Sequence, residues 1–364
     1  MKIGFLKPAI TNQDIKVMNK IIRSGWFAPG KVTEEFESKL ARYLQIKHAV
    51  MTSSATAALH LSLIMAGVQE GDEVITTPLS YVATSNVILY QRAVPVFVDV
   101  NAETGLLDLN KVAAKITKKT KIILPVHLYG QMVDMKKLKK IATKHNLIII
   151  EDAAHAIEAQ RDGVRPGQLS FSAALSFHVA KNITSGQGGA LVTSNGGYAQ
   201  RAELLRRDGV RNVNGKRHMF ELGYKYDATE FQAAMLLSQL KRIEQQHQKR
   251  NLLFQRYAKA FSGMGVDFPK IAPRTKHACH MFVVWIDPKK RDKIRKFLAK
   301  AGIDTSIHYD PIHLEPYYRK QFNYQRGDFP IAEKLGFSTI TLPLYPALTM
   351  EQQGYIIKKV KGAL

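Results

Sequence analysis

The sequence predicts an α/β fold, with a mainly parallel central sheet flanked by helices in a large domain and a smaller C-terminal α/β domain. Between residues 40 and 192, short apolar runs alternate with amphipathic segments, and strands that alternate with helices are typical of a parallel sheet. The apolar runs are rich in β-branched residues without polar alternation, which indicates strands buried on both faces. We place the large domain at residues 1–250 and the small domain at residues 251–364.

Seven strands are expected in the large domain, with helices between them. The predicted strands are 48–52, 73–77, 94–100, 121–126, 146–152, 172–177 and 189–194. The clearest helical segments are 55–67 and 135–146. Each connects one expected strand to the next, as the crossover of a parallel sheet requires.

A long helix from Thr229 to Phe261 is expected to link the two domains, because large residues recur there at spacings of three and four. A strand at 280–287, a helix at 292–302 and a strand at 339–342 then form the small domain. The last helix follows a capping box at residues 349–352.

The composition of the 364 residues indicates a folded, water-soluble protein. Hydrophobic residues make up 45% and charged residues 23%, which is ordinary for a globular chain and excludes a disordered one. The single cysteine, Cys279, excludes an internal disulfide and a cysteine-rich zinc site. It fits a reducing compartment. No apolar run is long enough to span a bilayer or to serve as a signal peptide, so a cytoplasmic protein is expected.

The net charge of +23 is unusual. Such an excess suits a nucleic acid, an anionic membrane surface or a phosphorylated substrate, and it also occurs on surfaces that are merely well hydrated. The basic residues are spread along the chain, with no dense tail, zinc-finger pattern or RNA-binding motif beside them. Nucleic-acid binding is therefore a minor alternative, and no metal site is expected.

Two chemically active residues follow apolar strands. Asp152 ends the strand LIIIED, and Lys181 lies beyond the strand SAALSF, shortly before three glycines at 186, 188 and 189. Open α/β sheets bind ligands at the carboxyl ends of their strands, and glycine lets the backbone approach a ligand closely. Taken singly, Asp152 could be a helix N-cap and Lys181 an ordinary surface lysine.

Together the two residues indicate pyridoxal phosphate (PLP) chemistry, which needs an amine for the aldehyde carbon and an acid for the ring nitrogen. Lys181 would supply the amine and Asp152 the acid. Residues 53–56 are small and lie between a strand and a helix, where free backbone N–H groups bind phosphate. Tyr81 offers an aromatic face to the ring. An ordinary N-cap at 53–56 and a core tyrosine at 81 are the alternatives.

A set of short motifs occurs in one order along the chain. They are SSATAAL (53–59), PLSYVAT (78–84), PVFVDV (95–100), PVHLYGQ (125–131), EDAAHA (151–156), SFHVAKNITSGQGGA (176–190), GYKYDATEFQAAM (223–235), HYDPIHLEPYY (308–318) and LPLYP (342–346). With the opening SGWFAPGKVTEEFE (24–37), this ordered set resembles the DegT-type nucleotide-sugar aminotransferases. Those proteins are fold-type I PLP enzymes.

The resemblance implies how the cofactor would be held. Lys181 would bind it covalently and would move the proton during amino transfer, and Asp152 would pair with the ring nitrogen. His155 would lie near the phenolic oxygen, and Tyr81 would stack on the ring. The phosphate would be bound by Ala55, Thr56, Ser176 and, from a neighbouring subunit, Lys225.

The resemblance also implies a homodimer, because the sites of this family are built at a subunit interface. The sugar and the nucleotide would be contacted by His308, Tyr309, His313 and Tyr317, for which a surface loop of polar aromatic residues is the alternative. The chain departs from the family's pattern at three places. Many members have glycine where Ala55 stands and asparagine followed by arginine in the segment of Lys225 and Asp227. An acidic residue is usual where Gln187 stands.

The implied reaction moves an amino group from an amino acid, with glutamate as the expected donor, to a nucleotide-linked keto sugar. The string SFHVAKNIT resembles members that act on 4-keto-6-deoxy hexoses or on 4-keto pentoses. A 4-keto sugar is therefore preferred over a 3-keto sugar, and a 4-keto-6-deoxy hexose is the expected acceptor. Such a product would serve deoxyamino-sugar biosynthesis for lipopolysaccharide or O-antigen. The alternatives are a PLP-dependent sugar dehydratase, against which the retained Lys181 argues, and a non-catalytic binder with the same fold.

Overall fold

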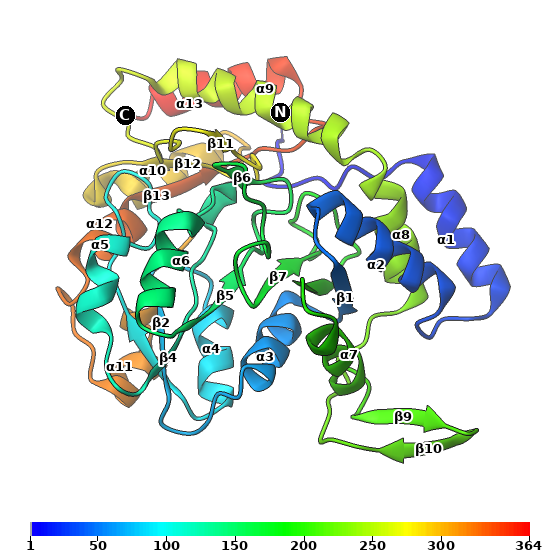
Figure 1. The fold of residues 1–364 in the computed structure, drawn as a ribbon. Helices are drawn as coiled ribbons and strands as arrows, with labels where there is room; N and C mark the ends of the chain where they lie inside the picture. The colour runs from blue at the N-terminus through cyan, green and yellow to red at the C-terminus, as the bar shows by residue number, and fades with distance from the viewer. Residues whose placement is uncertain (1) are drawn as a thin grey trace.

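In the computed structural model, which describes residues 2–364, a seven-stranded sheet forms the centre of the protein (Figure 1). The strands are β1 (His48–Thr52), β2 (Glu73–Thr76), β3 (Val94–Phe97), β4 (Thr120–Ile123), β5 (Ile148–Asp152), β7 (Ser172–Ser176) and β8 (Gly189–Thr193). Their order is β1-β8-β7-β5-β4-β2-β3. Only β8 runs antiparallel to its neighbours in this sheet. The predicted fold class and all seven predicted strands are confirmed.

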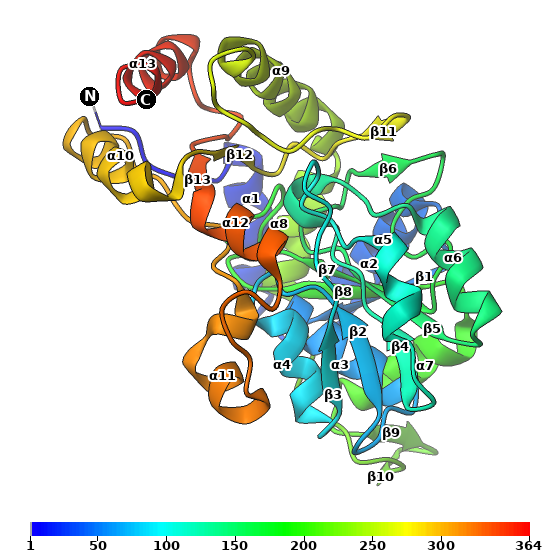
Figure 2. The ribbon, with the colours of Figure 1, turned by 90° about the vertical axis from the view of Figure 1, so that its left-hand side faces the viewer.

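Helices cover both faces of the sheet (Figure 2). They are α2 (Lys31–Leu44), α3 (Ala55–Met65), α4 (Ala83–Tyr90), α5 (Leu109–Val112), α6 (Met135–Lys144) and α7 (Gly196–Leu205). The first helix, α1 (Asn12–Ser24), packs against residues 230–240 instead. Ile122 of β4 packs in one apolar cluster with α3, α4 and α7, whereas Ile123 packs in another cluster with α2 and α6. Successive residues of a strand face opposite sides of the sheet. A strand that is covered by helices on both sides therefore needs apolar residues at successive positions.

The expected long helix from residue 229 to residue 261 is wrong, because two helices, α8 (Glu230–Leu240) and α9 (Ile243–Phe261), occupy that segment. The chain turns at Arg242, whose guanidinium donates to both carboxylate oxygens of Asp14 in α1. The same guanidinium also donates to the backbone carbonyl of Ala9. These contacts hold the turn in place and direct α9 away from α8.

The C-terminal part has its own apolar cluster, which includes Leu253, Phe282 and Ile340. Its elements are β12 (Phe282–Trp285), which pairs antiparallel with β13 (Thr339–Leu342), and α10 (Pro288–Lys300), α11 (Pro316–Phe322), α12 (Pro330–Ser338) and α13 (Met350–Lys361). The capping box before α13 is present as predicted. Ile3 also packs in this cluster, and Phe329 packs in the large core. The domain boundary at residue 250 stays a prediction.

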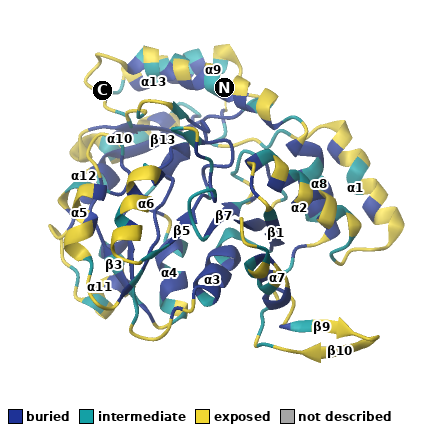
Figure 3. Cartoon of the chain, in the orientation of Figure 1, coloured by how far each residue is buried: buried dark blue, intermediate teal, exposed yellow. Residues whose placement is uncertain are grey.

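Shorter elements complete the chain. They are β6 (Gln160–Arg161), β11 (Thr275–Lys276), which pairs with β6, and the 3₁₀ turns Ala113–Lys115, Leu128–Gly130 and Ile312–Leu314. A hairpin of β9 (Val210–Val213) and β10 (Lys216–Met219) extends from the body near α7 and is largely exposed (Figure 3). In residues 2–364 no helix is both long enough and apolar enough to span a membrane.

Candidate active site

A cavity of about 380 Å³ lies at the carboxyl ends of several strands of the large sheet. Nine of the twelve predicted site residues line it. They are Ala55, Thr56, Tyr81, Asp152, His155, Ser176, Lys181, His308 and Tyr309. Residues that are far apart in the sequence therefore meet at one place, which is where an open α/β sheet binds its ligand.

Asp152 is fixed in the cavity wall by two hydrogen bonds. It is the last residue of β5 and is only 6% exposed. Its Oδ2 accepts a hydrogen bond of 2.7 Å from the hydroxyl of Thr84, and its Oδ1 accepts one of 3.1 Å from the backbone N–H of Ala154. A carboxylate held in this way can present its charge to a positively charged ring nitrogen.

Lys181 lies five residues after the end of β7, in a turn in which its backbone N–H donates to the carbonyl of His178. Burial lowers the pKa of its amine from 10.5 to about 8, and the nearby carboxylate of Asp152 acts in the opposite direction. An amine with this pKa is neutral in part of the molecules near neutral pH. It can therefore attack a carbonyl carbon and act as a base.

The N-terminus of α3 forms a cradle suited to an anion. Ser54 is the N-cap and accepts a hydrogen bond from the N–H of Ala57, while Ala55 and Thr56 at the start of the helix face the cavity. The first N–H groups of a helix have no acceptor within it and bind phosphate well. Gly189 of β8 passes so close that a Cβ there would overlap the backbone of Ser54 and Ala55.

His155 connects the cavity wall to the substrate side. Its Nδ1 accepts a hydrogen bond from the backbone N–H of Tyr129, so in the neutral ring Nε2 carries the hydrogen. Nε2 lies 3.1 Å from the hydroxyl of Tyr309 and donates to it. Burial, and then the neighbouring charge of Lys181, lower the pKa of His155 well below its usual value. His155 therefore acts as a neutral hydrogen-bond donor.

His308 is also neutral at physiological pH. Burial lowers its pKa to about 3, with a smaller contribution from Lys181. Its Nδ1 lies 2.8 Å from the hydroxyl of Thr341, and its carbonyl accepts a hydrogen bond from Tyr129. The loop of His308 and Tyr309 thus offers polar, uncharged groups to a ligand.

The structure does not bring the other three predicted residues into this cavity. His313 is fully buried, and its Nε2 lies 3.0 Å from Glu333 Oε1. Tyr317 is 62% exposed on α11. The side chain of Lys225 is 75% exposed, and its amine lies 3.4 Å from the carboxylate of Asp227. Lys225 therefore does not line the cavity of its own chain.

Sequence reasoning missed two residues that support the site. Thr84 belongs to the motif PLSYVAT, but its bond to Asp152 depends on how α4 meets β5. His280 lies just before β12, and its Nδ1 is 3.0 Å from the side-chain oxygen of Asn182. Its position in a run that looks like a strand gave no signal of a contact with the residue after Lys181.

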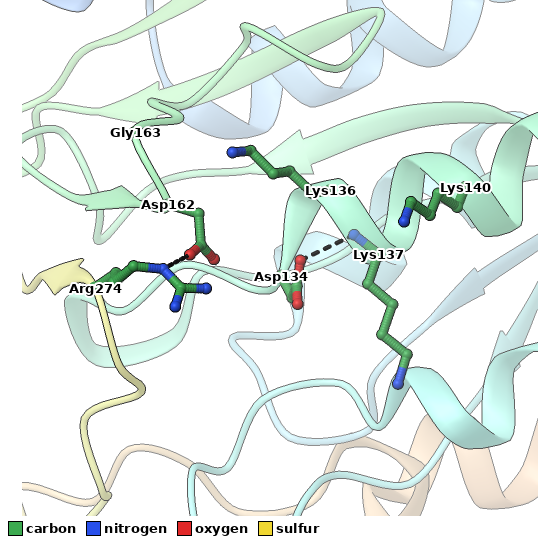
Figure 4. Close-up of a pocket in the computed structure, with 7 residues that line it drawn as sticks. All are labelled: Asp134, Lys136, Lys137, Lys140, Asp162, Gly163 and Arg274. Atoms are coloured by element: carbon green, nitrogen blue, oxygen red, sulfur yellow. Dashed lines mark hydrogen bonds and ion pairs between the residues drawn. The ribbon is translucent and has the colours of Figure 1, made fainter.

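A second, more open cavity lies beside α6 and has a basic lining (Figure 4). Lys136, Lys137, Lys140 and Arg274 line it, and Arg274 Nε donates to Asp162 Oδ1. It lacks a buried amine opposite a carboxylate, so we do not regard it as the reactive site.

The first cavity fits PLP. The anion cradle at Ala55 and Thr56, the amine of Lys181 and the carboxylate of Asp152 are the three groups that this cofactor requires for its phosphate, aldehyde carbon and ring nitrogen. Because Gly189 has no side chain, β8 can pass close to the cradle without filling it. A family model matches residues 8–361, and it describes the DegT/DnrJ/EryC1/StrS aminotransferase family. The chain belongs to this family.

Relatives with known names agree with this assignment. The spore coat polysaccharide biosynthesis protein SpsC of Bacillus subtilis is 35% identical, over 97% of this chain and 95% of its own. Spr1654 of Streptococcus pneumoniae, solved in its PLP form, is 30% identical with a TM-score of 0.96, covering 100% of this chain and 98% of its own. PseC of Helicobacter pylori, an aminotransferase involved in pseudoaminic acid biosynthesis, is 27% identical with a TM-score of 0.93, covering 100% and 99%.

The protein is a sugar aminotransferase of the DegT family, and its cofactor is PLP. The fold-type I architecture expected from the sequence is confirmed by the TM-scores above 0.9. The resemblance seen in the ordered motifs is confirmed over nearly the whole chain.

Proposed function

We propose that this DegT-family enzyme transfers an amino group from glutamate to a nucleotide-linked keto sugar, with a 4-keto-6-deoxy hexose as the preferred acceptor. The observation that carries the proposal is the placement of Lys181 and Asp152 in one cavity, beside the anion cradle at the N-terminus of α3. The product would enter deoxyamino-sugar biosynthesis for lipopolysaccharide or O-antigen in the cytoplasm. The roles of SpsC in spore coat polysaccharide biosynthesis and of PseC in pseudoaminic acid biosynthesis support a role in making sugars.

PLP, when bound, supplies an electron sink that stabilises negative charge on the substrate carbon. Lys181 Nζ takes up and releases the proton that moves during the transfer, and its pKa of about 8 suits both directions near neutral pH. Asp152 would pair with the ring nitrogen, and Thr84 holds the orientation of its carboxylate. Tyr81, which is 59% exposed and lines the cavity, would cover one face of the ring.

The substrate side is built from uncharged groups. His308 and His155 are neutral because burial lowers their pKa values, and Tyr309 keeps its proton because burial raises its pKa well above the ordinary value. Groups of this kind bind sugar hydroxyls by hydrogen bonds without competing for the proton of Lys181. The net charge of +23 favours the capture of an anionic diphosphate.

We further propose that the enzyme works as a homodimer with shared sites. Lys225 is exposed and does not line the cavity of its own chain. A long, flexible cation in that position is suited to reach a phosphate bound by the neighbouring subunit. Within the single chain, Lys225 Nζ lies 3.4 Å from Oδ2 of Asp227 and 4.0 Å from Oδ2 of Asp208.

A panel of nucleotide-linked 4-keto and 3-keto sugars, each with isotopically labelled glutamate, tests the proposal. Product mass and proton spectra should show the label on the ring carbon that carried the keto group, and the 4-keto-6-deoxy substrates should react fastest. If the 3-keto sugars react faster, the acceptor is a 3-keto sugar and not a 4-keto sugar. A deoxygenated product without label would identify a dehydratase instead, and no turnover of any nucleotide sugar by PLP-loaded protein would overturn the proposed function.

A further inference from the structure

His280 is a buried histidine behind the wall of the active site. It lies just before β12 and is 6% exposed. Its ring is 4.5 Å from the ring of His155, measured between centroids, with an angle of 44° between the planes. The next residue, Met281, lines the cavity. His280 therefore supports a cavity residue from behind.

The hydrogen bonds of Asn182 determine how His280 is protonated. The side-chain nitrogen of Asn182 donates to Glu158 Oε2 at 2.7 Å and to the carbonyl of Ala278 at 3.0 Å. Its side-chain oxygen must then be the acceptor for His280 Nδ1, which carries the hydrogen. Glu158 is itself fixed by Arg250, with 2.5 Å between the charged atoms and both side chains almost fully buried.

This arrangement leaves His280 as a neutral ring with one unused acceptor. Nε2 is buried and has no hydrogen-bond partner among residues 2–364. A buried polar atom without a partner costs free energy, so apolar packing alone does not account for an imidazole at this position. Burial, followed by the charge of Lys181, lowers the pKa of His280 well below its usual value, which keeps the ring neutral.

We propose that His280 is a positioning residue for both Lys181 and His155. Its Nδ1–H holds Asn182, the residue next to Lys181, and so fixes the turn from which the reactive amine extends. Its ring packs against that of His155, which also forms hydrogen bonds with Tyr129 and Tyr309. One side chain thus sets the mutual position of two groups that meet the cofactor, whichever sugar the enzyme uses.

Two substitutions separate the two contacts. His280→Phe keeps a ring against His155 but loses the donor to Asn182. His280→Asn keeps a donor near the position of Nδ1 but loses the ring. His277→Phe is the matched control, because His277 is buried in the same loop and bonds to the N–H of Cys279 and, through its carbonyl, to His247. The thermal midpoint of each variant reports its folding.

The measurements use cofactor-free and PLP-loaded protein. His280→Phe should slow the capture of PLP by the cofactor-free protein about fivefold, the effect of losing one ordinary hydrogen bond. His280→Asn should restore the capture rate but shift the pH midpoint of the visible absorbance of the loaded protein, because His155 is no longer held. His277→Phe should change the thermal midpoint without changing either quantity.

The proposal fails if a folded His280→Phe protein captures PLP at the wild-type rate, or if His280→Asn has the wild-type absorbance midpoint. It also fails if His277→Phe reproduces both effects, since the role of His280 would then be general support of the loop. Asn182→Ala provides a further arm. Combined with His280→Phe, it should slow capture no more than either change alone, because both remove the same bond, and additive effects would contradict the shared mechanism.

Discussion

The hydroxyl of Thr84 donates a hydrogen bond of 2.7 Å to Oδ2 of Asp152, across 68 residues of sequence. The bond joins the first turn of α4 to the carboxyl end of β5, and both side chains are buried. Thr84 also shares a hydrogen bond of 2.9 Å with the hydroxyl of Ser80. The carboxylate proposed to pair with the cofactor's ring nitrogen is therefore oriented by a neighbouring helix.

The first prediction concerns this bond. Thr84→Val keeps the shape of the side chain but removes the donor, so Asp152 loses a hydrogen bond that restricts its carboxylate. We expect PLP to bind about tenfold more weakly, in line with a hydrogen bond to a charged group. Cofactor titration by absorbance measures this change. Ser85→Ala, which removes the next buried hydroxyl in α4, should leave PLP affinity unchanged, and an equal loss in both variants would contradict the prediction.

The second prediction is a pH profile for Lys181. Its neutral amine is the form proposed to capture PLP, and burial lowers the pKa of that amine to about 8. The capture rate of the cofactor-free protein should therefore rise with pH and level off above about 8. A simple alkylamine measured alongside corrects for the titration of PLP itself. A rate that continues to rise towards 10.5, the ordinary lysine value, would show that the amine is not desolvated.

Asp152→Asn should shift the midpoint of this pH profile in a direction that the structure predicts. The carboxylate of Asp152 raises the pKa of Lys181 and so opposes the effect of burial. Without the negative charge the ammonium form loses support, so the midpoint of the capture rate should move to lower pH than in the wild type. A midpoint that stays in place or moves to higher pH would show that the two side chains do not interact.

The third prediction concerns the cradle at the start of α3. In Gly189→Ala the new methyl group would overlap the backbone of Ser54 and Ala55, and backbone cannot move aside as a side chain can. We expect a loss of about 1–3 kcal/mol in the free energy of unfolding, with PLP affinity reduced as well. Gly196→Ala is the control, because its methyl group would meet His48 Nε2 at 3.4 Å, an ordinary contact. Chemical denaturation and cofactor titration distinguish the two variants.

The fold was largely predictable, because most strands of the sheet are apolar runs with β-branched residues, which can be recognised without knowing their partner strands. The break between α8 and α9 was not predictable. No proline or glycine marks it, and it depends on the contact of Arg242 with Asp14, 228 residues away in sequence. A helical period continues through such a turn, since the pattern records burial and not the direction of the helix axis.

The candidate site shows the same division. Residues with reactive side chains at the ends of strands, such as Lys181 and Asp152, were found from the sequence and meet in one cavity. His280 was missed, since its contact with Asn182 joins residues 98 positions apart and carries no local signature. His313 shows the opposite case. Its motif suggested a ligand contact, but in this chain its side chain is buried beside Glu333 and does not line the cavity.

The last prediction tests whether the sites are shared. Lys181→Ala removes the reactive amine, and Lys225→Ala removes the exposed cation proposed to reach the partner's phosphate. In a mixed dimer with a two-fold interface, the subunit that retains Lys181 would receive Lys225 from its partner, so one site would be intact. Equal mixing should therefore restore about a quarter of the wild-type sites, measured as PLP-dependent turnover after the subunits have exchanged.

Mixing with the Lys181→Ala, Lys225→Ala double variant is the control. If sites are shared, Lys225→Ala subunits mixed with this variant receive no Lys225 from their partner, so their activity should not increase. Tagged subunits confirm that exchange has occurred. If confirmed mixed dimers of the two single variants show no more activity than the Lys225→Ala protein alone, Lys225 acts within its own chain or has no role in the site, because only a contribution across the interface lets two defective chains make one complete site.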